Sequence, residues 1–123
     1  MLDTNTKQHI NNFVEVLKNF EEYNDFVIAS EANENDPELK SLRNEFGRLR
    51  KHFNENQNNG NITQEEIQRL RSLQNHINSH HVVHNLVSSQ NELIVILLEC
   101  NERISREIGL DFAQKAAPSS CCG

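Results

Sequence analysis

Residues that mark turns and sheets are scarce in this sequence. Its 123 residues include four glycines, two prolines, one tyrosine and no tryptophan, which suits long helices better than the strands and turns of an all-β domain. Apolar residues make up 36% of the chain, and the mean hydropathy is -0.69. A protein with so little apolar material must either build thin layers of paired helices or share its core with a partner.

Long hydrophobic segments are also missing. The longest apolar run, Leu93–Leu98, has six residues, against the roughly 20 that a membrane-spanning helix requires. Residues 1–12 are polar and lack the apolar stretch of a signal peptide. We therefore expect a cytoplasmic protein without membrane insertion. The cysteines are three in number, at 100, 121 and 122, and this odd count without framework spacing argues against structural disulfides.

The charge balance excludes one broad class of function. The net charge is -6, whereas nucleic-acid binding needs a concentrated basic surface; we expect no direct contact with nucleic acid. Residues 1–36 carry eight acidic and two basic side chains, and residues 37–78 carry five acidic and seven basic ones. The middle section is thus mildly basic, which is most simply a solvated helix face with i,i+4 pairs.

Apolar spacing predicts helices in the first half of the chain. Residues 4–33 begin with a helical stripe (Ile10, Phe13, Val14, Leu17, Phe20) that becomes less regular after residue 20. Pro37 suits the first turn of a new helix, with Asp36 as its N-cap. That second helix has a regular heptad stripe made of Leu39, Leu42, Phe46, Leu49 and Phe53. Gly47 lies inside it, either to permit a close helix approach or as a tolerated flaw.

The second half carries two further helices. Thr63 and Glu66 form a capping-box pattern that starts a helix, and a short break follows near residues 78–81. The last helix runs from about Val82 to Ile108, and Gly109 has the position of a left-handed C-cap. Its heptad stripe comprises Val83, Val87, Gln90, Ile94, Leu97, Asn101, Ile104 and Ile108. Because residues 93–98 are apolar all round, this helix needs cover on every side, which predicts a dimer.

The predicted architecture is therefore all-α. About four long, antiparallel, amphipathic helices form a dimeric bundle over residues 1–110, and residues 111–123 form a short, flexible, cysteine-containing tail. The oligomer or partner interface is expected on the apolar residues of the second and last helices: Leu39, Leu42, Phe46, Leu49, Leu93, Ile94, Ile96 and Leu97.

Few residues have a spacing typical of catalytic or metal-binding sites. His76, His80 and His84 follow an i, i+4, i+8 spacing that metal ligands can use. However, the helix is expected to break near Ser79, and no acidic residue lies between 67 and 91 to orient a ligand. A polar helix junction, in which imidazoles cap backbone groups, is the simpler interpretation. No nucleophile has a local catalytic motif and Cys100 lies in an apolar stretch, so we predict no enzyme and no catalytic residues.

Adjacent thiols on the tail, Cys121 and Cys122, are not explained by folding. They are candidate ligands for a soft metal or an iron–sulfur cluster, or else simply face solvent. Two thiolates cannot complete a four-thiolate site, so a second subunit or another partner would supply the rest.

The order of these motifs resembles the YlbF/YmcA family of bacterial cell-fate and competence regulators. The resemblance rests on Asn-Asp-Pro-Glu-Leu at 35–39, the stripe that follows, His-Val-Val at 81–83, and Asn-Glu-Leu-Ile with Ile-Ser-Arg-Glu-Ile-Gly in the last helix. It spans nearly the whole chain. Two departures are Val82, where the family commonly has proline, and the short tail with only its adjacent cysteine pair.

The resemblance implies a self-associating, non-enzymatic regulator. The implied partners are a second copy, paralogous family members, a YaaT-like protein and RNase Y, through which the family influences mRNA processing, competence, sporulation and biofilm formation. It also implies a 4Fe-4S cluster shared between subunits, with Cys121 and Cys122 as ligands. A metal- or redox-responsive protein therefore stands as the alternative to an interaction module, and a chaperone-like helical adaptor is a third hypothesis.

Overall fold

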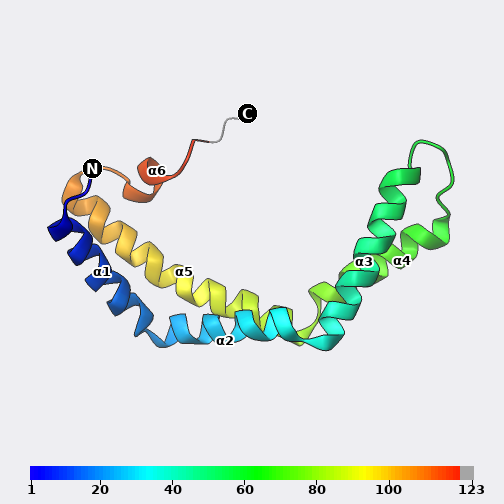
Figure 1. The fold of residues 1–123 in the computed structure, drawn as a ribbon, viewed down its shortest axis with the longest axis horizontal. Coiled ribbons are helices and arrows are strands. Elements are labelled where there is room, and N and C mark those ends of the chain that lie inside the picture. Colours follow the sequence, from blue (N-terminus) through cyan, green and yellow to red (C-terminus); the bar gives the residue numbers. More distant parts are fainter. Residues whose placement is uncertain (120–123) are drawn as a thin grey trace.

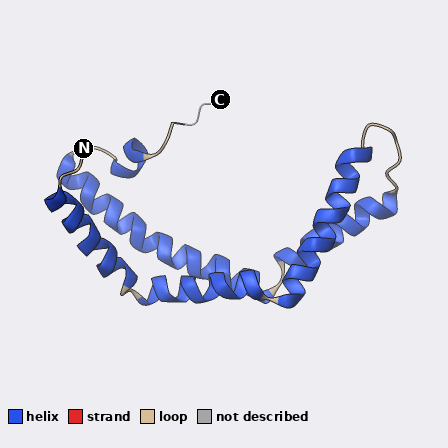
Figure 2. Ribbon diagram, in the orientation of Figure 1, coloured by secondary structure: helices blue, strands red, loops and turns tan. Residues whose placement is uncertain are grey.

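The computed structural model describes residues 1–119, and every regular element in that range is an α-helix (Figure 2). The helices are α1 (Thr4–Lys18), α2 (Glu21–Asn35), α3 (Pro37–Asn56), α4 (Gln64–Asn78), α5 (His81–Ile108) and α6 (Phe112–Ala116). They form two arms (Figure 1): α2 packs along α5 in one arm, and α3 packs on α4 in the other. The arms meet where α2 leads into α3 and α4 leads into α5.

The first predicted helix is in fact two helices, broken at Asn19 and Phe20. In one continuous helix, Leu17 and Phe26 would lie about 180° apart, because each residue advances about 100°. Both side chains are half-buried in the structure. Phe20 adopts an extended backbone as the N-cap of α2, and this break lets α1 and α2 take independent rotations, so that Leu17 and Phe26 need not lie on opposite faces.

Capping side chains define where the helices begin. Asp36 accepts a hydrogen bond from the backbone N–H of Leu39, 2.9 Å away, and so caps α3 as predicted. The predicted capping box of α4 is also confirmed: Thr63 and Glu66 bond each other's backbone N–H groups. Both interactions satisfy N–H donors that have no partner inside the helix. The two helices of the second arm are therefore fixed locally by their own sequence.

The end of α5 is also as predicted. Gly109 has a φ of 75°, the left-handed conformation that side chains other than glycine rarely adopt. The chain then turns back, and part of the predicted tail forms α6. The Asn101 side chain accepts from the backbone N–H of Ala113 at 2.8 Å, and Ser105 accepts from that of Phe112 at 2.9 Å. These bonds hold α6 against the last turns of α5.

The core is thin, as the composition predicts. Among residues 1–119, four hydrophobic side chains are buried: Ala29, Leu39, Leu73 and Val82. Leu39 and Leu73 lie on the two helices of the second arm and are 0% and 2% exposed. The all-helical prediction is confirmed. The described residues form six helices rather than about four, because the first predicted helix is divided and the tail contributes α6. A single chain arranges them as two-layered arms.

Candidate functional site

The heptad stripe of α5 is uncovered over much of its length. Three members of its first half remain exposed: Val87 by 49%, Ile94 by 40% and Leu97 by 45%. The side of α5 that packs in the chain is a different one, which carries Val82, Leu86, Leu93, Ile96 and Cys100, all buried or half-buried. We call Val83, Val87, Gln90, Ile94 and Leu97 the α5 seam. Asn101, the next residue of the heptad stripe, accepts a hydrogen bond from the backbone of Ala113 in α6.

An apolar groove lies between α1 and α5, and it includes Ile96 and Cys100 from the packed side of α5. It has a volume of about 310 Å³, and its lining residues are Phe13, Phe20, Ile96, Glu99, Cys100, Arg103 and Ile104. No Cα atom of α1 comes within 8 Å of one in α5. Helix α1 has no buried residue, and Ile10 and Phe13 are 45% and 43% exposed. Thus α1 presents an apolar face that the single chain leaves open.

The predicted interface residues fall into two groups. On α3, Leu39 is buried, while Leu42, Phe46 and Leu49 are half-buried on the helix that packs against α4 within the same chain. On α5, Leu93 and Ile96 are half-buried, whereas Ile94 and Leu97 are exposed.

Gly47 and Cys100 are two further residues singled out in the sequence. A Cβ atom added to Gly47 would meet nothing within 4 Å, so this glycine serves no close helix approach within the chain. Cys100 is half-buried in the groove. Cys121 and Cys122, the predicted cluster ligands, lie outside the described residues.

Acidic and basic side chains are unevenly distributed between α2 and α3. Helix α2 carries five carboxylates and no basic residue, and in the described chain none of the five makes an ion pair: Glu21, Glu22, Asp25, Glu31 and Glu34. Helix α3 carries five lysines and arginines, among which Arg43 bonds the backbone and side chain of Asn33 at 3.0 and 2.9 Å. The mildly basic middle section therefore corresponds to the second arm, with five of its seven basic residues on α3 and Arg69 and Arg71 on α4.

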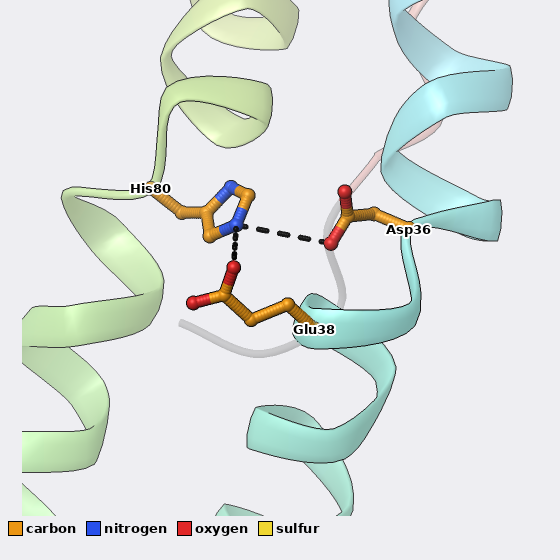
Figure 3. Close-up of side chains that lie close together, drawn as sticks. All are labelled: Asp36, Glu38 and His80. Atoms are coloured by element: carbon orange, nitrogen blue, oxygen red, sulfur yellow. Dashed lines mark hydrogen bonds and ion pairs between the residues drawn. The ribbon is translucent and has the colours of Figure 1, made fainter.

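Polar side chains from both arms converge where the arms meet (Figure 3). His80 is 7% exposed, and its Nε2 atom lies 3.4 Å from Oε2 of Glu38 and 3.7 Å from Oδ1 of Asp36. On the other side of the ring, Nδ1 accepts a hydrogen bond of 3.2 Å from the backbone N–H of Val82. His80 thus caps α5, which confirms the predicted role of an imidazole at this junction.

Two more histidines adjoin this cluster. The Nε2 atom of His76 lies 3.6 Å from Oε1 of Glu38. The ring of His81 stacks on that of His80, with centroids 4.7 Å apart. The sequence indicated the spacing of His76 and His80 but placed no acidic residue near them. The fold brings Asp36 and Glu38 to them from about 40 residues away. In the sequence, these two acidic residues belonged to the Asn-Asp-Pro-Glu pattern, which indicated only the start of a helix.

The described residues contain one group of His, Cys, Asp and Glu side chains that is compact enough to hold a metal ion. It consists of Asp36, Glu38 and His80, whose ligand atoms all lie within 4.8 Å of one another. In the same part of the chain, none of the helices is long and apolar enough to cross a bilayer. These observations define a class of elongated helical protein with open apolar faces and a polar junction.

A known family model matches most of the chain. The chain belongs to the family described as control of competence regulator ComK, YlbF/YmcA, whose model matches residues 7–109. The resemblance found in the sequence motifs is thereby confirmed, and the matched stretch runs from α1 to the C-cap of α5. No curated protein and no solved structure is significantly similar to the chain.

Proposed function

We propose that this member of a family of competence regulators is a non-enzymatic adaptor that self-associates through the α5 seam and acts by forming protein–protein complexes. The observation that carries the proposal is a heptad-spaced apolar stripe that the single chain leaves exposed, on its longest helix. Contiguous exposed apolar patches are typical of protein–protein interaction sites.

The residue types along the seam favour pairing with a second helix of the same kind. Val87 and Ile94 occupy one heptad position and Gln90 and Leu97 the other. β-Branched residues at the first position, with leucine at the second, favour two-stranded coiled coils. Pairing two copies through this stripe would bury the side chains that are now 40–49% exposed. The open face of α1 offers a second apolar surface for association.

Partners beyond a second copy are proposed from family membership. They are paralogous family members, a YaaT-like protein and RNase Y, through which the complex would influence mRNA processing, competence, sporulation and biofilm formation. The groove between α1 and α5 is the part of the surface suited to an apolar helix of such a partner, because Phe13, Phe20 and Ile96 line it.

The double variant Ile94→Glu/Leu97→Glu tests self-association. We expect the unmodified protein to elute as a dimer in size-exclusion chromatography with light scattering, and the variant to elute as a monomer, because two buried, unpaired carboxylates oppose pairing. Val95→Glu is the matched control: Val95 is 57% exposed on the same helix but off the seam. A monomeric unmodified protein, or a Val95→Glu protein that dissociates equally, would contradict the proposal.

The alternative function assigns the regulatory role to Cys121 and Cys122 as ligands of a shared 4Fe-4S cluster. The double variant Cys121→Ser/Cys122→Ser distinguishes the two functions. An adaptor that works through its helical faces keeps its partners after this change, whereas a cluster-dependent sensor loses both iron and partners. Anaerobic purification with iron and sulfide assays, together with mass spectrometry of co-purified proteins, reads out both outcomes.

A further inference from the structure

We propose that Asp36, Glu38 and His80, with His76 as a fourth donor, form a binding site for a divalent transition-metal ion of the zinc type. The site lies where the two arms meet, far along the chain from the tail cysteines, and it does not depend on the proposed adaptor function. Its ligands come from the junction of α2 with α3 and from the junction of α4 with α5.

The chemistry of the donors favours zinc over calcium or magnesium. Two imidazole nitrogens and two carboxylates form a mixed nitrogen–oxygen set, which zinc accepts in tetrahedral sites, whereas calcium and magnesium prefer oxygen alone. The buried His80 is held from both sides, by Val82 and by the carboxylates. The carboxylates are directed at Nε2, the ring nitrogen that would bind the ion.

The distances from His80 to the two carboxylates are close to those of a tetrahedral site. Metal–ligand bonds of about 2.1 Å place neighbouring ligand atoms roughly 3.4 Å apart in a tetrahedron. The Nε2 atom of His80 lies 3.4 Å from Oε2 of Glu38 and 3.7 Å from Oδ1 of Asp36. His76 lies outside this compact group, with its Nε2 atom 3.6 Å from the other carboxylate oxygen of Glu38, Oε1, so its ring would have to turn toward the ion. The three atoms of the compact group all lie within 4.8 Å of one another, against about 3.4 Å between ligands of a tetrahedral site.

The protons of His80 give the site a specific signature. Because Nδ1 accepts the N–H of Val82, the proton of the neutral ring lies on Nε2 and points to Glu38. Zinc binding at Nε2 displaces that proton, and a ring that stays neutral then carries its proton on Nδ1. If the proton moves to Nδ1, this nitrogen becomes a donor, and the N–H of Val82 loses its acceptor. Metal binding through the tautomer shift therefore changes the environment of the Val82 amide.

Zinc titration by isothermal calorimetry tests the site in the full chain. The Cys121→Ser/Cys122→Ser background removes the two adjacent thiols, which would bind zinc themselves. We expect saturable binding of one ion per chain, weakened at least about tenfold by Glu38→Gln. Glu38 is 61% exposed in its side chain, so this variant is expected to fold. His80→Asn is a second variant, since asparagine also caps helices.

His84→Ala is the matched control, because His84 shares the helical spacing but lies outside the cluster. Zinc binding that is unchanged in Glu38→Gln and His80→Asn, or lost equally in His84→Ala, overturns the proposal. The same is true if no saturable binding occurs up to about millimolar zinc. In ¹H–¹⁵N spectra, the Val82 amide is expected to shift on zinc addition, and a Val82 amide that stays in place while zinc binds assigns the ion to other ligands.

Discussion

Truncation of Leu39 is the sharpest test of how this thin core holds together. The side chain is 0% exposed at the start of α3, next to the junction of the arms. Deleting buried methyl groups removes their transfer free energy and leaves a cavity, so Leu39→Ala is expected to lower the free energy of unfolding by about 3 kcal/mol. Domains are typically stable by about 5–15 kcal/mol. With four buried hydrophobic residues in the described chain, one such loss removes a large share of the total.

Urea denaturation followed by circular dichroism measures this effect, at one protein concentration for all variants. A slope of about 2 kcal/mol per molar urea converts the loss into a midpoint lowered by about 1.5 M. Val95→Ala is the control, because Val95 is 57% exposed and exposed positions change stability by about 0.5 kcal/mol or less. Equal midpoint shifts in the two variants would refute the assignment of Leu39 to a closed core.

Two further predictions concern glycines and an N-cap. Gly47→Ala is expected to raise the free energy of unfolding by about 1 kcal/mol, because this glycine is helical and has free space around it. Gly109→Ala is expected to lower it by about 1 kcal/mol, because the φ of Gly109 is 75°. Thermal melts of the two variants check both signs. Hydrogen bonds from the side chain and backbone of Thr6 lower the pKa of the Asp3 carboxyl, so its stabilisation of α1 is complete above the ordinary value of 3.8 and is lost as the pH falls through the lower, folded-state pKa. Amide exchange in α1 measured against pH should show this loss, and Asp3→Asn, which keeps a cap without the charge, should abolish the pH dependence.

The amino-acid sequence by itself determined the local elements. Asp36 with Pro37, Thr63 with Glu66, and Gly109 mark helix ends through hydrogen bonds and backbone preferences that involve only neighbouring residues. For this reason the helix boundaries at these points agree with the prediction. The scarcity of apolar residues likewise indicated thin layers, since composition limits how much surface a chain can bury. The family resemblance rested on the order of these same local motifs.

Only the tertiary structure decided which apolar stripes are covered and which polar groups meet. Periodicity places Leu93, Ile94, Ile96 and Leu97 on α5, but whether a residue faces α2 or solvent depends on how that helix is rotated in the arm. In the local sequence, Asp36 and Glu38 indicate the start of a helix, and His80 indicates a helix junction. Their convergence depends on the angle between the arms, a long-range property that no local pattern encodes, and it brings two carboxylates to the one buried histidine of the described chain.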